Sequence, residues 1–210
     1  MTLYRLDQIV LKISGNAARF LNGLTSNTLD KPLNAFLNQH GRIMATFFQQ
    51  QSAEDEFLVA VPPATREDLL QHLDRYAKLN HTQIQTTDLK AYMDVDTAKV
   101  LFKKEDIPNQ ISLEQFTLFR LEQGLPLLGI DYQPQEFILN LDENRYVSYT
   151  KGCFLGQEPV SKVHSRSKPT RKLVVKFEDK CTPEEKLSMT SKATDPATGR
   201  VKGFVFVSNK

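Results

Sequence analysis

One segment, Lys151–Glu158, places one of the chain's two cysteines between two glycines, a lysine and a carboxylate. Gly152 and Gly156 permit a tight turn or the close approach of another backbone segment. The residues at 157–159 are typical of the first turn of a helix. The chain is therefore expected to form a loop that turns directly into a helix, with Cys153 just before the helix N-terminus. A lysine and a helix start can lower the pKa of a thiol and make it reactive; the alternative is a glycine-rich turn around a small apolar cysteine.

Length and charge restrict the classes of protein that are possible. A chain of 210 residues forms one large domain or two small ones and buries about 70% of its unfolded surface. The formal net charge of +2 gives no global electrostatic support for nucleic acid, so direct nucleic-acid binding is not expected.

Cys153 and Cys181 form neither a disulfide framework nor a paired metal motif, which fits a reducing, cytoplasmic compartment. Residues 1–13 lack the apolar core of a signal peptide and no long apolar run follows, so no membrane association is expected.

The first hundred residues alternate strand and helix patterns. Ser14 is expected to cap the first helix, and Thr65 with Asp68 the second. Strands are expected at residues 3–13, 35–37, 43–49, 57–61, within 82–95 and at 100–103, and helices at residues 14–23 and 65–79.

The second half begins with a polar segment at residues 104–110, which is expected to connect two lobes. Ser112 with Gln115 predicts a capped helix that Gly124 ends. Two strand patterns, 172–177 and 201–207, lie in the tail on either side of a stretch rich in Thr, Ser and Pro. They are too few for an independent barrel, so we expect them to pack on the main body.

Two motifs resemble one protein family. The Lys151–Glu158 segment is similar to the K-G-C-[FY]-x-G-Q-E signature of the YgfZ family of folate-binding proteins, relatives of the glycine-cleavage T-protein linked to iron–sulfur cluster maintenance. Residues 120–131 resemble that family's R-x-E-x-G-x-P-x-x-G-x-D segment. A weaker likeness at residues 15–27 and 41–45 extends the resemblance over most of residues 1–165.

The resemblance implies an α+β, multi-lobe fold like that of the T-protein, with antiparallel sheets, flanking helices and a truncated C-terminal β segment. Residues 1–165 are expected to form the folate-binding body, with a lobe junction near residues 104–111, and residues 166–210 the reduced β segment. Two departures stand out. Pro159–Lys162 replaces the family's aliphatic residue and arginine, and the chain is shorter than typical members.

The helix at 112–123 carries the leading candidate for folate recognition. Glu122 lies on the apolar side of the helix, where a carboxylate is costly unless it meets a buried donor or faces a polar cavity. The resemblance implies that it accepts hydrogen bonds from the pterin ring of tetrahydrofolate or a derivative; a structural ion pair at a helix end is the alternative. Arg120, about 200° away around the helix, ranks lower as a ligand and can instead fix the helix or the lobe contact. From the signature, Cys153 is the candidate catalytic residue, and Lys151, Gly152, Gln157 and Glu158 are candidate cofactor-binding residues.

The remaining charged and metal-binding residue types give weaker signals. Basic residues crowd positions 162–172, and a solvated loop is the favoured interpretation; a site for a polyglutamate tail, an acidic partner or RNA phosphates is the alternative. Cys153, Cys181 and His164 lack the spacing of a metal site, so a cluster could bind only in a dimer or with outside ligands. His164 lies too far along the expected helix to activate Cys153, about 16 Å away.

The leading functional hypothesis is a cytoplasmic, folate-binding accessory protein that assists iron–sulfur cluster assembly or repair. Any support of tRNA modification would come through the enzymes that this protein assists. Cys153 would act in a redox-sensitive or cluster-related step, and folate and iron–sulfur proteins or assembly factors would be the partners. Two alternatives stay open: a folate-dependent aminomethyltransferase of the T-protein type, and a docking module that has lost folate.

Overall fold

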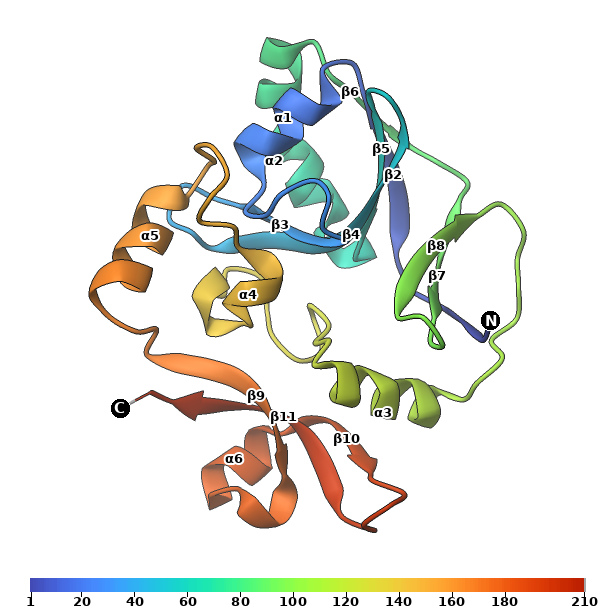
Figure 1. Ribbon diagram of the computed structural model, residues 1–210, viewed down its shortest axis with the longest axis vertical. Helices are drawn as coiled ribbons and strands as arrows, with labels where there is room; N and C mark the ends of the chain where they lie inside the picture. The colour runs from blue at the N-terminus through green and yellow to red at the C-terminus, as the bar shows by residue number, and fades with distance from the viewer. Residues whose placement is uncertain (210) are drawn as a thin grey trace.

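The computed structural model describes residues 1–209, in which three antiparallel sheets are joined by helices (Figure 1). The central sheet has the order β3-β4-β5-β2-β6, the N-terminal sheet β1-β7-β8 and the C-terminal sheet β10-β11-β9. The strands are β1 Leu3–Arg5, β2 Ile9–Ser14, β3 Leu33–Leu37, β4 Ile43–Ala53, β5 Glu56–Val61, β6 Gln83–Thr86, β7 Lys90–Asp94, β8 Lys99–Lys103, β9 Arg171–Phe177, β10 Thr190–Thr194 and β11 Val201–Ser208. This arrangement confirms the expected α+β class.

Six α-helices and three short 3-10 turns connect the strands of the described chain. The helices are α1 Ala17–Leu24, α2 Arg66–Asn80, α3 Leu113–Gln123, α4 Glu143–Tyr146, α5 Gln157–Arg166 and α6 Pro183–Ser188, and the turns are η1 Pro63–Thr65, η2 Ile138–Asn140 and η3 Glu178–Lys180. α3 runs below the central sheet and above the C-terminal sheet in the view of Figure 1.

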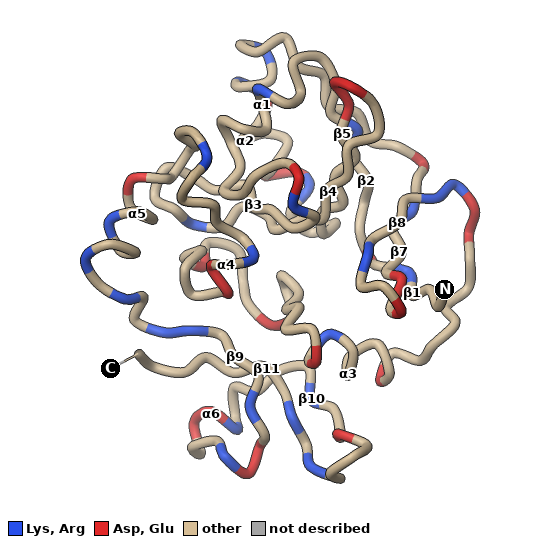
Figure 2. The backbone as a smooth tube through the Cα atoms, viewed as in Figure 1, with Lys and Arg blue, Asp and Glu red and all other residues tan. Residues whose placement is uncertain are grey.

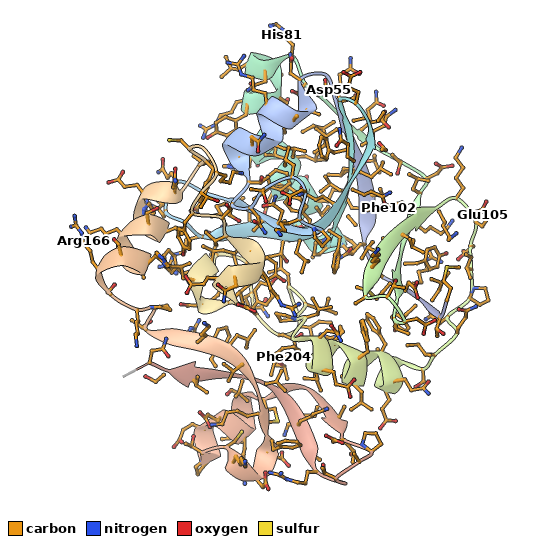
Figure 3. The ribbon with its side chains drawn as sticks, in the orientation of Figure 1. Asp55, His81, Phe102, Glu105, Arg166 and Phe204 are labelled. Atoms are coloured by element: carbon orange, nitrogen blue, oxygen red, sulfur yellow. The ribbon has the colours of Figure 1, made fainter. Side chains whose placement is uncertain are left out.

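The central sheet buries both of its faces. Side chains alternate along a strand, so Leu11 and Ile13 of β2 pack with α1 and α2, whereas Val10 packs toward the N-terminal sheet. On the helix-covered face, Phe36 and Phe47 stack with ring centroids 4.5 Å apart. A third cluster joins Ala35, Leu37 and Ile43 to the segment between α3 and α5 and to Phe204 of the C-terminal sheet, which Figure 3 shows beside α3. The three sheets therefore share neighbouring apolar cores.

A buried ion pair connects α3 to the C-terminal sheet. Arg120 Nη1 lies 2.8 Å from Asp131 Oδ2, and both side chains are almost fully buried. The other oxygen, Asp131 Oδ1, accepts hydrogen bonds from Thr190 and Ser191 of β10 at 2.8 and 2.5 Å. Asp131 Oδ2 also accepts from the backbone N–H of Leu127 at 2.8 Å. One carboxylate thus joins a helix, a loop and a strand.

Several local expectations are confirmed. The capping box of Ser112 and Gln115 starts α3, and Gly124 ends it in a left-handed conformation. The hairpin of β3 and β4, the strand β5 and the helix α2 lie where their patterns predict them.

Other expectations are wrong. The single strand expected at 3–13 is two strands in different sheets, because the chain turns at residues 6–8. Ser14 caps no helix, since it is the last residue of β2 and Asn16 precedes α1. Thr65 donates its hydroxyl proton to the carbonyl of Pro62 and makes no capping bond to α2.

The tail contains more regular structure than the two strands that its pattern predicts. A third strand, β10, and the helix α6 fill the polar stretch between β9 and β11. The helix begins with a capping box of Thr182 and Glu185, a signal that was present in the sequence. The predicted domain boundary at 165/166 falls at the C-terminal end of α5 and stays a prediction, as does the lobe junction near 104–111, which lies in the connection between β8 and α3.

Replacing Asp131 with alanine should lower the free energy of unfolding by about 3–5 kcal/mol, because it leaves the Arg120 guanidinium buried and uncompensated. Urea denaturation followed by circular dichroism measures this. Asp106→Ala removes the partner of the exposed Arg5 side chain and is the matched control, with an expected loss of about 0–1 kcal/mol. Equal losses of unfolding free energy in the two variants would show that the buried ion pair stabilises the fold no more than the exposed one does.

Candidate functional site: the signature loop and the inter-sheet cavity

The signature segment forms a loop that leads into α5. The helix begins at Gln157 with Gly156 as its N-cap residue, which confirms the helix start that the sequence predicts. The loop is joined to the end of α1, because the Leu155 N–H donates to the Gly23 carbonyl at 2.9 Å. The side chain of Cys153 is exposed on this loop.

Gly156 allows the loop to lie directly against the β3–β4 hairpin. Its φ angle is 82°, which only glycine adopts readily. A Cβ atom at this position would overlap the carbonyl oxygen of Asn38 and would lie 3.1 Å from the backbone nitrogen of Gly41. Gly152 has no such constraint, since a Cβ there would meet nothing within 4 Å. The second glycine of the signature is therefore required by backbone packing.

Lys151 fixes the other end of the loop. Its Nζ donates to the carbonyl oxygens of Thr25 and Asn27, at 2.7 and 2.8 Å, just after the C-terminus of α1. It also lies 5.5 Å from the centroid of the Phe154 ring. Burial lowers the pKa of Lys151 to about 8. This lysine binds backbone carbonyls and holds the loop in place.

Cys153 lies in an open depression between the loop and two helices. Its neighbours there include Gly23 and Leu24 of α1 and Tyr76 and Asn80 of α2. The second cysteine, Cys181, follows η3 beside the C-terminal sheet; burial raises the pKa of its thiol. Within residues 1–209, no three His, Cys, Asp or Glu side chains gather as metal ligands would.

A polar cluster joins α5 to α4. His164 Nδ1 lies 3.0 Å from Glu143 Oε2, which also accepts a hydrogen bond from the Tyr149 hydroxyl at 2.8 Å. The His164 and Tyr149 rings stack with centroids 3.8 Å apart. Burial alone would raise the pKa of Glu143, but the hydrogen bonds from Tyr149 and His164 outweigh it, and the pKa is lowered. His164 is therefore engaged with a carboxylate, in agreement with its exclusion as the base for Cys153.

The basic residues at 162–172 extend from α5 to the start of β9, where Figure 2 shows a run of blue. Lys162, Arg166 and Lys168 are exposed, and Arg166 points away from the body of the molecule in Figure 3. Arg171 instead pairs with Glu136 and lies over the Phe206 ring, 4.3 Å from its centroid. Which anion this stretch binds, if it binds one, stays a prediction.

A cavity of about 500 Å³, here called the inter-sheet cavity, lies among the N-terminal sheet, the central sheet and α3. Its wall is mainly apolar and includes Tyr4 and Phe116, whose rings stack 3.9 Å apart. The bordering residues are Tyr4–Gln8, Leu33, Thr46–Phe48, Pro62–Ala64, Met93, Leu113, Phe116, Arg120, Leu125–Ile130 and Tyr146. A mainly apolar pocket of this size with a few polar groups is the usual form of a small-molecule site.

The polar groups of the inter-sheet cavity come from distant parts of the chain. Thr46 Oγ1 hydrogen-bonds the buried Tyr132 hydroxyl at 2.5 Å, and burial raises the pKa of the Tyr146 hydroxyl well above its usual range. Two buried atoms, Gln8 Oε1 and Arg120 Nε, have no hydrogen-bond partner within residues 1–209. Buried polar atoms in proteins nearly always have a partner. Both atoms belong to residues that border the cavity, but the atoms themselves have almost no accessible surface.

The chain was compared with known proteins. No family model matches it. It is 24% identical to the iron–sulfur cluster assembly factor IBA57 homolog, mitochondrial, of Dictyostelium discoideum, in an alignment that covers 74% of this chain and 57% of the relative. The chain thus spans little more than half the length of that relative. The crystal structure of the glycine cleavage system aminomethyltransferase T from Bartonella henselae superposes with a TM-score of 0.68, at 14% identity, over 99% of this chain and 78% of that one.

The resemblance to the YgfZ-type, T-protein-like family is confirmed. The expected T-protein-like fold is confirmed as well, because the structural similarity covers almost the entire chain. In the described part of the chain, no helix is long and apolar enough to cross a membrane.

The second family motif contributes two candidate residues, Arg120 and Glu122, and their side chains have different surroundings. Arg120 borders the inter-sheet cavity, but its Nη atoms bind Asp131, the Leu125 carbonyl and Ser191, so it fixes the contact between α3 and β10. Glu122 meets a largely buried donor, Lys202, which agrees with one of the two expectations for it and with the alternative of an ion pair at a helix end. Its role in folate binding stays a prediction. Its side chain is 58% exposed and lies 3.6 Å from Lys202 Nζ of the C-terminal sheet, because that sheet packs against this end of α3. Glu122 does not border the inter-sheet cavity.

The signature residues also lie away from the inter-sheet cavity. Lys151, Gly152 and Cys153 are on the α1 side of the molecule, and Gln157 and Glu158 start α5. None of them borders the cavity, so a cofactor-binding role for them stays a prediction. Sequence analysis missed the residues that do border it, such as Gln8 and Thr46, because they belong to no motif.

Alanine at Gly156 should lower the free energy of unfolding by at least about 2 kcal/mol. The left-handed conformation alone costs a residue with a Cβ about 1–2 kcal/mol, and the overlap with the Asn38 carbonyl adds to it. Gly152→Ala in the same loop is the matched control, with an expected change within about 0.5 kcal/mol. Urea denaturation of both variants tests this; equal stability of the two would contradict the packing role of Gly156.

Lys151 should make stability depend on pH in the alkaline range. Because burial lowers its pKa from about 10.5 to about 8, the folded state holds fewer protons than the unfolded state between these values. Its destabilising contribution is full below pH 8 and is lost as the pH rises toward 10.5. The difference in unfolding free energy between the unaltered protein and Lys151→Met should therefore shift in favour of the unaltered protein from pH 7.5 to pH 9.5. A constant difference in urea titrations over this range would contradict it.

Proposed function

We propose that this chain assists iron–sulfur cluster assembly or repair, with tetrahydrofolate or a derivative bound in the inter-sheet cavity and Cys153 as its reactive group. The observation that carries the proposal is the similarity to an iron–sulfur cluster assembly factor over 74% of the chain. The iron–sulfur proteins or assembly factors that receive the cluster would be its partners. Any effect on tRNA modification would follow from the enzymes it supports.

The inter-sheet cavity fits the chemistry of a folate. The stacked rings of Tyr4 and Phe116 offer an aromatic wall for flat rings. The polar side chains of Gln8 and Thr46 at its border would bind the polar edge of such a ring. The exposed Arg5 at the border of the cavity is a suitable partner for the carboxylates of the glutamyl tail. A bound tetrahydrofolate would supply a carrier for one-carbon units.

Cys153 suits a step that involves another macromolecule. Its thiol is exposed, and the loop that carries it is held by Lys151 at one end and by the tight packing of Gly156 at the other. Iron–sulfur clusters are normally bound by several thiolates. Cys181 belongs to the C-terminal part and not to the loop, so the remaining ligands of a cluster that Cys153 handles would come from a second chain or a partner.

The T-protein fold also favours a second candidate function, a folate-dependent aminomethyltransferase. That reaction needs an acid or base near the reactive nitrogens of the folate. Asp7 is the carboxylate that borders the inter-sheet cavity in the described chain, and its side chain is exposed. Formation of methylenetetrahydrofolate in a reconstituted glycine-cleavage assay, and its loss in Asp7→Asn, would favour this candidate.

Two measurements test the proposal. Calorimetric titration with 5-formyltetrahydrofolate should show binding, and at 100 times Kd the ligand should stabilise the protein by about 2.7 kcal/mol, equivalent to a Tm rise of about 5–10 °C. Cys153→Ser should bind the folate with unchanged affinity but fail to restore iron–sulfur enzyme activity in cells that lack the unaltered protein.

Cys181→Ser is the matched control for the second measurement and should restore activity. The folate part of the proposal is contradicted if the intact protein binds no reduced folate. Full activity of Cys153→Ser in cells would remove the thiol from the mechanism.

A further inference from the structure

The outer side of α5 carries basic side chains that form no ion pair within residues 1–209. This surface, here called the α5 basic face, consists of Lys162 and Arg166 on the helix and Lys168 just beyond it. We propose that the α5 basic face is a docking surface for an acidic protein, and that a partner bound there also covers Cys153. The inference rests on the proposed function, in which the thiol acts together with another macromolecule.

The α5 basic face is turned to solvent because the opposite side of the helix is packed in the core. Val160 is fully buried, and Val163 packs against the same apolar cluster. Successive helix residues are about 100° apart, so Lys162 and Arg166 lie about 200° and 240° around the helix from Val160. Both side chains are exposed, and Figure 2 shows blue segments along the outer edge of α5. An ordered helix, and not a loop, therefore presents these two cations.

The lack of ion pairs sets the α5 basic face apart from other basic residues in this half of the chain. Five of them pair with nearby carboxylates: Arg145 with Asp142, Arg171 with Glu136, Lys176 with Glu185, Lys192 with Glu178 and Arg200 with Asp179. Glu158 lies one helical turn before Lys162, but within residues 1–209 no ion pair joins the two.

The stability of α5 does not explain this charge pattern. Like charges four residues apart, such as Lys162 and Arg166, destabilise a helix. The helix dipole favours a cation in the last turn, where Arg166 lies, but it gives no advantage to Lys162 in the middle of the helix or to Lys168 beyond its end. An acidic surface on a partner would neutralise all three side chains together.

The surroundings of α5 favour an acidic protein over other anions. Sites for single-stranded nucleic acid add aromatic rings on which bases stack, but the ring of Tyr149 beside α5 already stacks on His164 and its hydroxyl donates to Glu143. The α5 basic face does not border the inter-sheet cavity, so the glutamyl tail of a folate bound there would meet Arg5 at the cavity border instead. Carboxylates on a protein surface need neither a stacking ring nor a link to the cavity.

The thiol lies within the area that a partner on the α5 basic face would cover. α5 has ten residues and is therefore about 15 Å long, and the loop with the exposed Cys153 leads directly into its N-terminus. A typical interface covers about 800 Å² of each protein, which is a patch about 30 Å across. Figure 1 shows this loop and α5 along the same edge of the molecule. One partner can therefore contact the cations and the thiol together.

The test compares how fast Cys153 reacts with peptides of different charge. Two peptides of equal length, one rich in glutamate and one with glutamine in its place, each carry a cysteine activated as a mixed disulfide with thionitrobenzoate. The Cys153 thiolate attacks the sulfur of the peptide cysteine, a new disulfide forms, and thionitrobenzoate leaves and is measured by its absorbance. All proteins carry Cys181→Ser, which removes the other thiol.

The acidic peptide should react about tenfold faster than the neutral one at about 10 mM salt, where the Debye length of about 30 Å exceeds the length of α5. At about 1 M salt the Debye length is about 3 Å, and the two rates should be equal. Lys162→Gln, Arg166→Gln and Lys168→Gln combined should reduce the ratio of the two rates at low salt to about one. Equal rates for the two peptides at low salt in the protein with an intact α5 basic face would overturn the inference.

The matched control combines Lys99→Gln, Lys104→Gln and Lys180→Gln, which make the same change of net charge at exposed lysines outside the α5 basic face and outside the depression around Cys153. It should keep the tenfold ratio, and loss of the ratio in the control would overturn the inference. Both combined variants should keep the Tm of the unaltered protein, because exposed side chains without ion pairs contribute little to stability. The salt dependence with an intact face tests the inference even if a variant melts lower.

Further outcomes separate the partner classes and the two proposals. If labelled oligouridine binds the α5 basic face more tightly than a glutamate-rich peptide of equal charge, measured by fluorescence anisotropy, the partner is a nucleic acid and the inference is overturned. If Cys153→Ser fails to restore iron–sulfur enzyme activity in cells but the variant of the α5 basic face restores it fully, the inference is overturned and the proposed function stands. If the rate ratio depends on the face but Cys153→Ser restores full activity, the inference stands and the proposed role of the thiol falls.

Discussion

The contact between Arg120 and Asp131 organises the middle of this molecule. A buried ion pair is favourable where hydrogen bonds satisfy the remaining atoms of its groups. Asp131 meets this condition with Thr190, Ser191 and the backbone of Leu127, and Arg120 meets it at both Nη atoms but not at Nε. The pair thereby fixes three things together: the rotation of α3, the path of the loop that follows it, and the docking of β10. One wall of the inter-sheet cavity consists of this helix and this loop. The cavity therefore depends on an interaction with the C-terminal sheet.

Whether a feature of the fold could be predicted from the sequence depends on how far apart along the chain the interacting residues lie. The start of α3 and the start of α5 follow from signals within a few residues, so the sequence predicts both. The break between β1 and β2 could not be predicted, because the apolar alternation continues through it and the two strands pair with different partners. The ion pair of Glu122 joins it to Lys202, eighty positions away, and no local pattern reveals such a partner.

The candidate site likewise has one part that could be predicted from the sequence and one part that could not. The motif containing Cys153 is contiguous, so its residues and its exposed loop could be read from the chain. The inter-sheet cavity is assembled from segments that range from residue 4 to residue 146. Residues such as Gln8 and Thr46 have no feature in the sequence that sets them apart from other polar residues. Only packing brings them together.

The depression that contains Cys153 and the inter-sheet cavity share no bordering residue. Residues 25–27 contact elements of both regions: Lys151 of the loop donates to the carbonyls of Thr25 and Asn27, and the Ser26 hydroxyl donates to the carbonyl of Tyr146 at 2.6 Å. Tyr146 itself borders the cavity. A partner at the thiol and a small molecule in the cavity would therefore contact different residues, so neither would have to leave before the other arrives.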